Sequence, residues 1–229
     1  MKLAGWLCVI VASVGVASYF AFQRERADTP WVWIIMAVPT LAFAAVGVWR
    51  LRRDGELDRV KPKWGDFTRG FLGAIVLFAA TLAMTKLFMR PGGASPRSMW
   101  IPTLYTQVGA QSMQAHAAAV ALAIVVMAVG EELLWRGLVT RLLEEHFGSR
   151  WAWVYAAGLY SLAHVPSMWA LRSPLGTLNP ILPIAALGAG LVWGAMARSF
   201  GRLTPGILAH ALFVWCVLMM FPLATLRQG

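Results

Sequence analysis

Charged side chains are scarce in this sequence. Only 13% of the 229 residues are Asp, Glu, Lys or Arg, whereas 59% are hydrophobic. A soluble domain carries about 25% charged residues, so the composition excludes an ordinary soluble protein. Several apolar runs reach the roughly 20 residues that a helix needs to cross a bilayer. Open sheets are excluded because lipid cannot satisfy their edges. The sequence therefore predicts an all-α, polytopic transmembrane helical bundle.

The apolar runs predict about seven spans, with six to eight possible. They are about 3–22, 31–49, 70–89, 113–130 with a possible continuation to 147, 151–170, 181–200 and 205–226. Turn-forming residues separate several of them, as in the Pro- and Gly-rich stretch 91–96. No internal repeat and no separate soluble domain is recognisable. We therefore expect a single integral membrane domain over residues 1–229, with a motif-bearing core at about 113–226.

Cysteines and familiar catalytic motifs are also few or missing. Cys8 and Cys216 both fall inside predicted spans without metal-ligand spacing, and such cysteines usually pack as small hydrophobic side chains. There is no His-Glu-x-x-His helix, Gly-x-Ser-x-Gly elbow, Walker loop or Rossmann glycine pattern. The N-terminal run has only Lys2 before it and no clear cleavage site, so we expect it to be retained as the first span.

Positive charge lies mostly at the ends of the predicted spans. The formal net charge is +10, and seven of the 20 basic residues fall in the connection 50–69. The positive-inside rule then predicts that this connection and the N-terminus are cytoplasmic. The pattern favours contact with the lipid bilayer over binding of nucleic acid. The Ala-, Arg- and Trp-rich composition suggests a bacterial source, so we expect the protein to be integral to a bacterial inner membrane.

The sequence has only ten acidic residues, and two of them adjoin a segment that is apolar enough to lie in a membrane. Glu131 and Glu132 directly follow the apolar run 117–130, and intramembrane ionisable residues commonly mark functional sites. Arg136 stands four residues after Glu132, in the order that favours an ion pair on a helix. Glu131 lies about 100° further around the helix and has no such partner. We expect Glu131 to be free to act as a general base. The alternative is that both acids are solvated at the membrane boundary.

Two histidines lie inside later spans. His164 is in the fifth predicted span, where Tyr160 could hydrogen-bond it and Pro166 should kink the helix. His210 lies in the last span. Each histidine alone could simply hydrogen-bond a neighbouring helix. Together with Glu131 they predict a site in which the glutamate deprotonates water and the imidazoles stabilise the oxyanion. Alternatively, these three side chains could hold a zinc ion.

The order of these motifs resembles the CPBP family of CAAX proteases and bacteriocin-processing intramembrane proteases, which are related to the type II CAAX prenyl endopeptidase. The motifs read Glu131-Glu132-Leu-Leu-Trp-Arg136, Tyr160-Ser-Leu-Ala-His164 and His210-Ala-Leu-Phe-Val214. The resemblance implies a glutamic-type peptide hydrolase in which Glu131 activates water. It implies that His164 and His210 complete the site. It also implies that Glu132 and Arg136 support it.

The sequence departs from the family pattern at two positions. Tyr160 stands where the family often has Phe, and Val214 stands where it usually has Asn or another polar residue. In the family, that Asn is associated with holding the oxyanion. The only Asn of the chain is Asn179, in a connection. One oxyanion donor contributes about 3–4 kcal/mol, so Val214 calls activity into question.

The resemblance leaves the activity and the substrate open. An endopeptidase would act on a membrane protein or a lipidated peptide, and some family members resemble myxosortase-like enzymes that trim C-terminal membrane tails. Val214 would also suit a non-catalytic family member that binds or chaperones membrane proteins. A proton-coupled transporter would use Glu131 and the histidines as a relay. It would be expected to show inverted repeats or broken helices in both halves, and the sequence shows neither.

Overall fold

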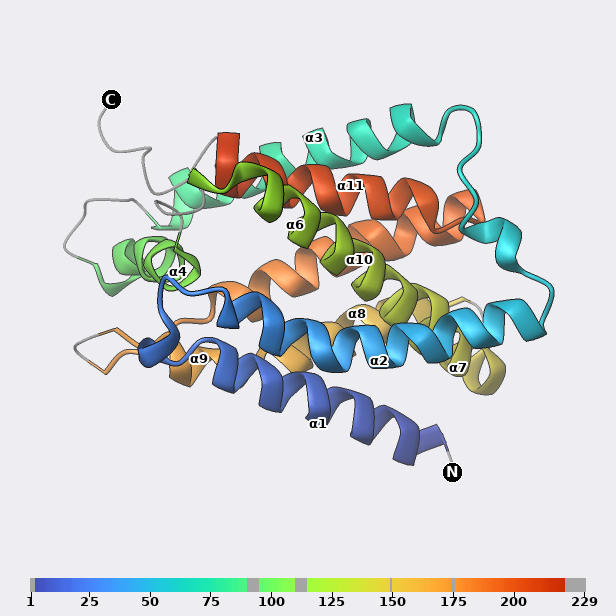
Figure 1. Cartoon of the computed structure of the whole chain (residues 1–229), viewed down its shortest axis with the longest axis horizontal. Helices are drawn as coiled ribbons and strands as arrows, with labels where there is room; N and C mark the ends of the chain where they lie inside the picture. The colour runs from blue at the N-terminus through green and yellow to red at the C-terminus, as the bar shows by residue number, and fades with distance from the viewer. Residues whose placement is uncertain (1–2, 90–94, 110–114, 149, 174–175, 221–229) are drawn as a thin grey trace.

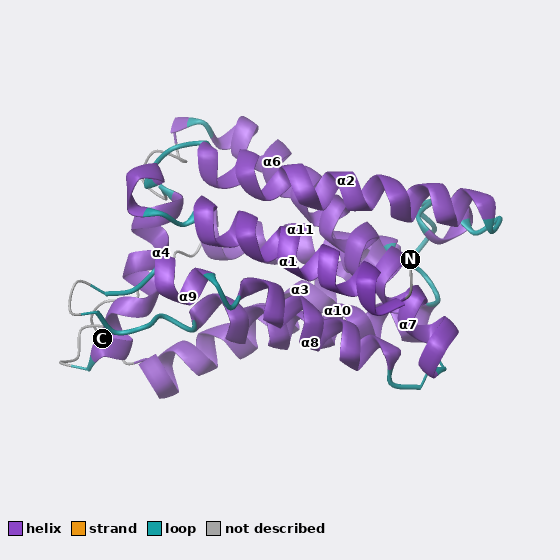
Figure 2. Ribbon diagram, turned by 90° about the horizontal axis from the view of Figure 1, so that it is seen from below, coloured by secondary structure: helices purple, strands orange, loops and turns teal. Residues whose placement is uncertain are grey.

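The computed structural model describes residues 3–89, 95–109, 115–148, 150–173 and 176–220, and its regular elements are all helical. The longer helices run side by side, with the connections gathered at the two ends (Figures 1 and 2). They are α1 (Leu3–Ala21), α2 (Trp31–Arg53), α3 (Asp66–Met84), α6 (Ala117–Glu132), α8 (Ala152–His164), α10 (Ile181–Phe200) and α11 (Thr204–Trp215). Shorter helices are α4 (Trp100–Val108), α7 (Thr140–Phe147) and α9 (Ser167–Ala170), and π-helical segments cover Thr85–Met89, Leu133–Val139 and Cys216–Met220. The sequence pattern had not predicted α4.

Five helices are long and apolar enough to cross a membrane, which confirms the all-α membrane fold. They are Leu3–Ala21, Trp31–Arg53, Asp66–Phe88, Ala117–Phe147 and Ile181–Phe200. The fourth of these includes the continuation of the helix to residue 147 that the sequence allowed. The predicted span 205–226 corresponds to the shorter apolar helix Thr204–Met220, and residues 221–226 lie outside the described part.

The predicted span 151–170 is divided rather than merely kinked. Its first part, α8, has 13 residues and ends at His164, and α9 begins after Pro166. Proline has no backbone N–H and cannot continue the hydrogen-bond ladder. The Ser167 hydroxyl instead donates to the carbonyl of His164 at 2.7 Å. As a result, the candidate histidine is the last residue of α8.

Close helix contacts hold the motif-bearing helices together. Helix α6 packs against α2 and α11, and α8 packs between α1 and α10 (Figure 1). A Cβ atom on Gly47 of α2 would lie 2.8 Å from the Leu133 carbonyl oxygen, and one on Gly70 of α3 would lie 2.5 Å from Leu208 Cβ of α11. Small residues let membrane helices approach at such distances. Backbones therefore meet directly where α2 contacts the segment that follows α6.

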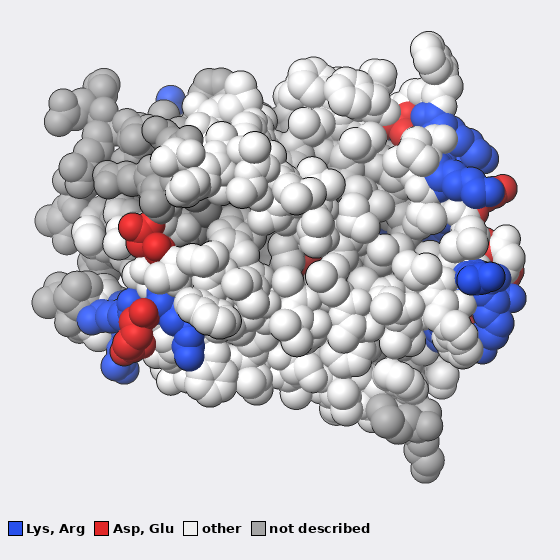
Figure 3. Space-filling view, in the orientation of Figure 1, with Lys and Arg blue, Asp and Glu red and all other residues white. Residues whose placement is uncertain are grey.

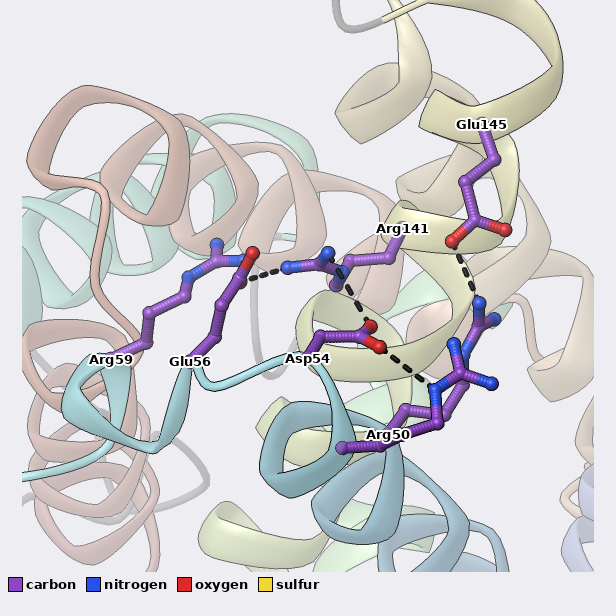
Figure 4. Close-up of polar contacts among 7 residues, drawn as sticks. Arg50, Asp54, Glu56, Arg59, Arg141 and Glu145 are labelled. Carbon is purple, nitrogen blue, oxygen red and sulfur yellow. Dashed lines mark hydrogen bonds and ion pairs between the residues drawn. The ribbon is translucent and has the colours of Figure 1, made fainter.

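Charged side chains gather at the two ends of the bundle, and the broad band between them shows only one small acidic spot (Figure 3). At one end, ion pairs join α7 to the connection after α2 (Figure 4). Arg141 pairs with Glu56 and lies 3.7 Å from Asp54, and Arg50 pairs with Glu145 at 2.7 Å. The charge distribution fits a chain that spans a membrane, and the ion pairs fix α7 to its neighbour.

Candidate active site

The two adjacent glutamates lie where α6 widens into the π-helical segment Leu133–Val139. Such segments are rare and frequently occur at functional sites. The Thr140 hydroxyl donates to the Trp135 carbonyl, five residues earlier, at 2.8 Å and so satisfies a backbone acceptor in the wider turn. Glu131 is 8% exposed and Glu132 is fully buried. The carboxylates are therefore inside the protein, and the alternative that both are solvated at its boundary is wrong.

Glu132 forms the ion pair with Arg136 that its spacing suggested. Arg136 Nη1 lies 3.1 Å from Glu132 Oε1, and both side chains are almost completely buried. Arg136 Nη2 also donates to the carbonyl of Gly190 on α10 at 2.9 Å. The guanidinium lies 5.4 Å from the ring centres of both Tyr160 and Trp193. A buried charge needs such pairing and hydrogen bonding, and here three helical elements supply it.

His210 of α11 lies between the two carboxylates. Its Nδ1 is 3.3 Å from Glu132 Oε1, and its Nε2 is 3.9 Å from Glu131 Oε2. A carboxylate held by Arg136 is ionised and can only accept, so we assign the proton to Nδ1 and the acceptor role to Nε2. The ring stacks on Trp193, with ring centres 3.7 Å apart and an angle of 16° between the planes. The histidine is thus fixed with its acceptor nitrogen toward Glu131.

Tyr160 connects the other histidine to Glu131. Its hydroxyl donates to Glu131 Oε2, while its backbone carbonyl lies 2.9 Å from His164 Nδ1. The expected hydrogen bond between Tyr160 and His164 therefore involves the backbone, because the hydroxyl is taken by the glutamate. A carbonyl can only accept, so His164 Nδ1 carries a proton and Nε2 is left available. Within the described chain, no hydrogen bond joins His164 directly to Glu131 or His210.

Val214 follows His210 by one turn of α11 and is half-buried. An apolar side chain cannot donate a hydrogen bond, so Val214 offers none to the site.

The zinc alternative does not fit the arrangement. Among the described residues, no group of three or more His, Cys, Asp or Glu side chains is placed to hold a metal ion. Glu131 Oε2 already accepts from Tyr160, and no hydrogen bond or ion pair brings His164 to the other two proposed ligands. We assign no step to a metal.

Sequence reasoning missed two residues that shape the site, Gly190 and Trp193. Both lie in a predicted span and look like ordinary apolar positions. Trp193 is one of 12 tryptophans, and nothing in its local sequence sets it apart. Its importance comes from α10 packing against α8 and α11, which is a long-range contact.

Comparison with known proteins identifies the part of the chain that carries this site. Residues 113–216 match the family described as type II CAAX prenyl endopeptidase Rce1-like. No curated protein and no solved structure matches the chain. The matched range includes both glutamates, both histidines and the side chains that position them. Over residues 113–216, which carry the whole candidate site, the chain is therefore similar to the type II CAAX prenyl endopeptidase Rce1-like family of CAAX proteases.

Proposed function

We propose that the protein is an intramembrane endopeptidase in which Glu131 activates water, with His164 and His210 completing the site. The observation that carries this proposal is the 3.9 Å separation between Glu131 Oε2 and His210 Nε2. Both atoms can accept a hydrogen bond. Two acceptors at that distance can share one water, because each hydrogen bond to it measures about 2.8 Å. Such a water would direct a lone pair away from both groups.

The reaction would be a hydrolysis of a peptide bond. The water oxygen bonds to the scissile carbonyl carbon while one water proton passes to Glu131, and the carbonyl electrons become an oxyanion. The C–N bond then breaks as Glu131 returns that proton to the leaving nitrogen. The products are a carboxylic acid and an amine, and the acid then passes its remaining proton to the amine to give a carboxylate and an ammonium ion, so atoms and charges balance.

The remaining residues would prepare these groups. Glu132 accepts from His210 Nδ1 and so orients the imidazole, as the buried carboxylate does in a Ser-His-Asp triad. Tyr160 donates to Glu131 Oε2 and so holds the carboxylate in position. His164 offers Nε2 to substrate or water, since its Nδ1 is engaged by the Tyr160 carbonyl.

The surroundings favour a substrate that is itself held in the membrane. Glu131 follows the apolar stretch of α6 and is only slightly exposed, so a soluble polar peptide would have to leave water to reach it. A membrane protein tail or a lipidated peptide would not meet that barrier. We propose this substrate class, including C-terminal tails of the kind that myxosortase-like enzymes trim.

The test is cleavage of a set of membrane-tail peptides, lipidated and not, by purified protein in detergent. Glu131→Gln should lower the rate at least about 10³-fold, because an amide cannot accept the proton. Glu25→Gln is the matched control, since it makes the same chemical change at an exposed acid. Thermal unfolding of both variants checks their folding. Equal turnover by the folded Glu131→Gln variant and the wild type would refute the general-base assignment.

Val214 supports a second candidate, a non-catalytic family member that binds membrane proteins. This reading predicts that wild type cleaves none of the peptides and yet retains tails on affinity capture. It also predicts that Glu131→Gln captures them equally well. Cleavage above the Glu131→Gln blank would exclude it.

A further inference from the structure

One hydrogen-bond donor beside the glutamates has no acceptor. Trp193 is 2% exposed, and its Nε1 is buried without a hydrogen-bond partner. The indole nitrogen can only donate. Buried polar groups are nearly always paired, so an unpaired one requires an explanation, and a catalytic role is one of the recognised ones.

The packing places the indole that carries this donor against the candidate active site. The Trp193 ring lies flat against the ring of His210, whose Nε2 faces Glu131. Arg136 lies 5.4 Å from the same indole and anchors α10 through the carbonyl of Gly190, one turn before Trp193. The indole is therefore held in a fixed position next to the atoms that would activate water.

Four neighbouring side chains of the site already have acceptors for their donors. The Tyr160 hydroxyl donates to Glu131, and Nδ1 of His210 donates to Glu132. His164 Nδ1 donates to a backbone carbonyl, and Arg136 donates to Glu132 and Gly190. The Trp193 N–H is left without a partner, while Val214, at the position usually occupied by an amide, cannot donate.

We propose that the Trp193 indole N–H donates to the oxyanion that forms on the scissile carbonyl oxygen during the reaction. This proposal rests on the proposed endopeptidase function. A neutral donor fixed in a water-excluded site is well suited to stabilise developing negative charge, because it needs no reorganisation as the charge appears. The N–H is shielded from solvent in this structure, so the substrate must displace a neighbouring side chain to reach it.

The experiment compares Trp193→Phe with wild type. Phe keeps an aromatic ring against His210 but lacks the donor and one of the two fused rings of the indole; loss of the donor should lower kcat about 10²-fold with little change in KM. The matched control is Trp100→Phe. Trp100 also has a buried Nε1 without a partner, but it packs in a separate cluster with Ile101 and Tyr105. That variant should keep the wild-type kcat.

Two further measurements distinguish a lost donor from a disturbed fold. Adding Val214→Asn to Trp193→Phe should recover part of kcat, because the new amide would serve the same oxyanion. A tail peptide with a phosphonate at the scissile position imitates that oxyanion. Trp193→Phe should weaken binding of the phosphonate about 10²-fold while leaving binding of the matching amide peptide unchanged.

The outcomes separate this inference from the proposed function. If wild type cleaves the peptides and Trp193→Phe cleaves them equally fast, the donor role is wrong and the endopeptidase proposal stands. If wild type neither cleaves any peptide nor prefers the phosphonate to the amide, both proposals fail.

Discussion

At the scale of single residues, Tyr160 is the residue that contacts both Glu131 and His164. Its hydroxyl reaches Glu131, its carbonyl reaches His164, and its ring packs 5.2 Å from that of Trp135. The family often has Phe at this position, which would keep the ring and the carbonyl but lose the hydroxyl. The extra donor is therefore a feature of this chain that acts on its proposed general base.

We expect Tyr160→Phe to remain folded and to be a slower enzyme. A hydrogen bond to a charged group contributes about 1.5–3 kcal/mol, so its loss should leave the Glu131 carboxylate less firmly held. The cleavage rate should fall about tenfold or more, while the thermal unfolding midpoint stays close to that of wild type. Rates measured with one tail peptide, together with thermal unfolding, provide the check. An unchanged rate would mean that the hydroxyl has no influence on the base.

At the scale of helices, the site depends on how closely α2 approaches the π-helical segment. Gly47 has no side chain, and the space beside it is filled by the backbone carbonyl of Leu133, just after the glutamates. A carbonyl within a helix cannot move away as a flexible side chain can. The contact between these two helices therefore helps to set the position of Glu131 and Glu132.

We predict that Gly47→Ala destabilises the protein by about 1–3 kcal/mol, as overpacking usually does. It should also lower the cleavage rate, because the displaced segment carries the glutamates. Gly188→Ala is the control, since a Cβ there meets nothing within 4 Å. Thermal unfolding in detergent and peptide cleavage should be measured for both. Wild-type behaviour of Gly47→Ala would show that the bundle adjusts at this contact.

Local sequence predicted some parts of the site and could not predict others. The i,i+4 pair of Glu132 with Arg136 lies within one helix, so spacing alone indicated it. The second partner of Glu132, His210, is 78 residues away and depends on α11 packing against α6. Trp193 joins the site by the same kind of long-range packing. Pro166 indicated a kink, but whether the helix bends or ends there depends on its surroundings.

At the scale of the whole molecule, the charged end shown in Figure 4 anchors the helix that continues from the site. Partial burial of Glu56 opposes its ionised form, but hydrogen bonds and charges from Arg141 and Arg59 outweigh this and hold the pKa of Glu56 below its usual value. A hydrogen bond from Arg53 likewise lowers the pKa of Asp54. These carboxylates are therefore ionised at neutral pH and bind α7 to the connection after α2.

Acid should weaken this attachment. A carboxylate whose pKa is lowered by folding stabilises the fold above its unfolded pKa of about 4, and that stabilisation is lost as pH falls through the folded value. The thermal unfolding midpoint should therefore decrease once the pH is lowered below about 4. Arg141→Gln should be less stable at neutral pH by about 1 kcal/mol, the upper range for a partly exposed pair. The difference between variant and wild type should shrink in acid. A constant difference across pH would show that Arg141 acts through packing alone.

The π-helical segment also changes how the residues after it are rotated about the helix axis relative to the residues before it. Successive residues of an α-helix are rotated by about 100°, so a widened turn offsets everything that follows. The carboxylates at the end of α6 must face α8 and α11, whereas Arg141 on α7 must face the connection after α2. In a regular helix the angle about the helix axis between the glutamates and Arg141 would be fixed by the number of residues between them. The wide turn changes that angle, so that both groups can meet their partners. A one-residue deletion within Leu133–Val139 would therefore force the chain to lose one set of partners in order to keep the other.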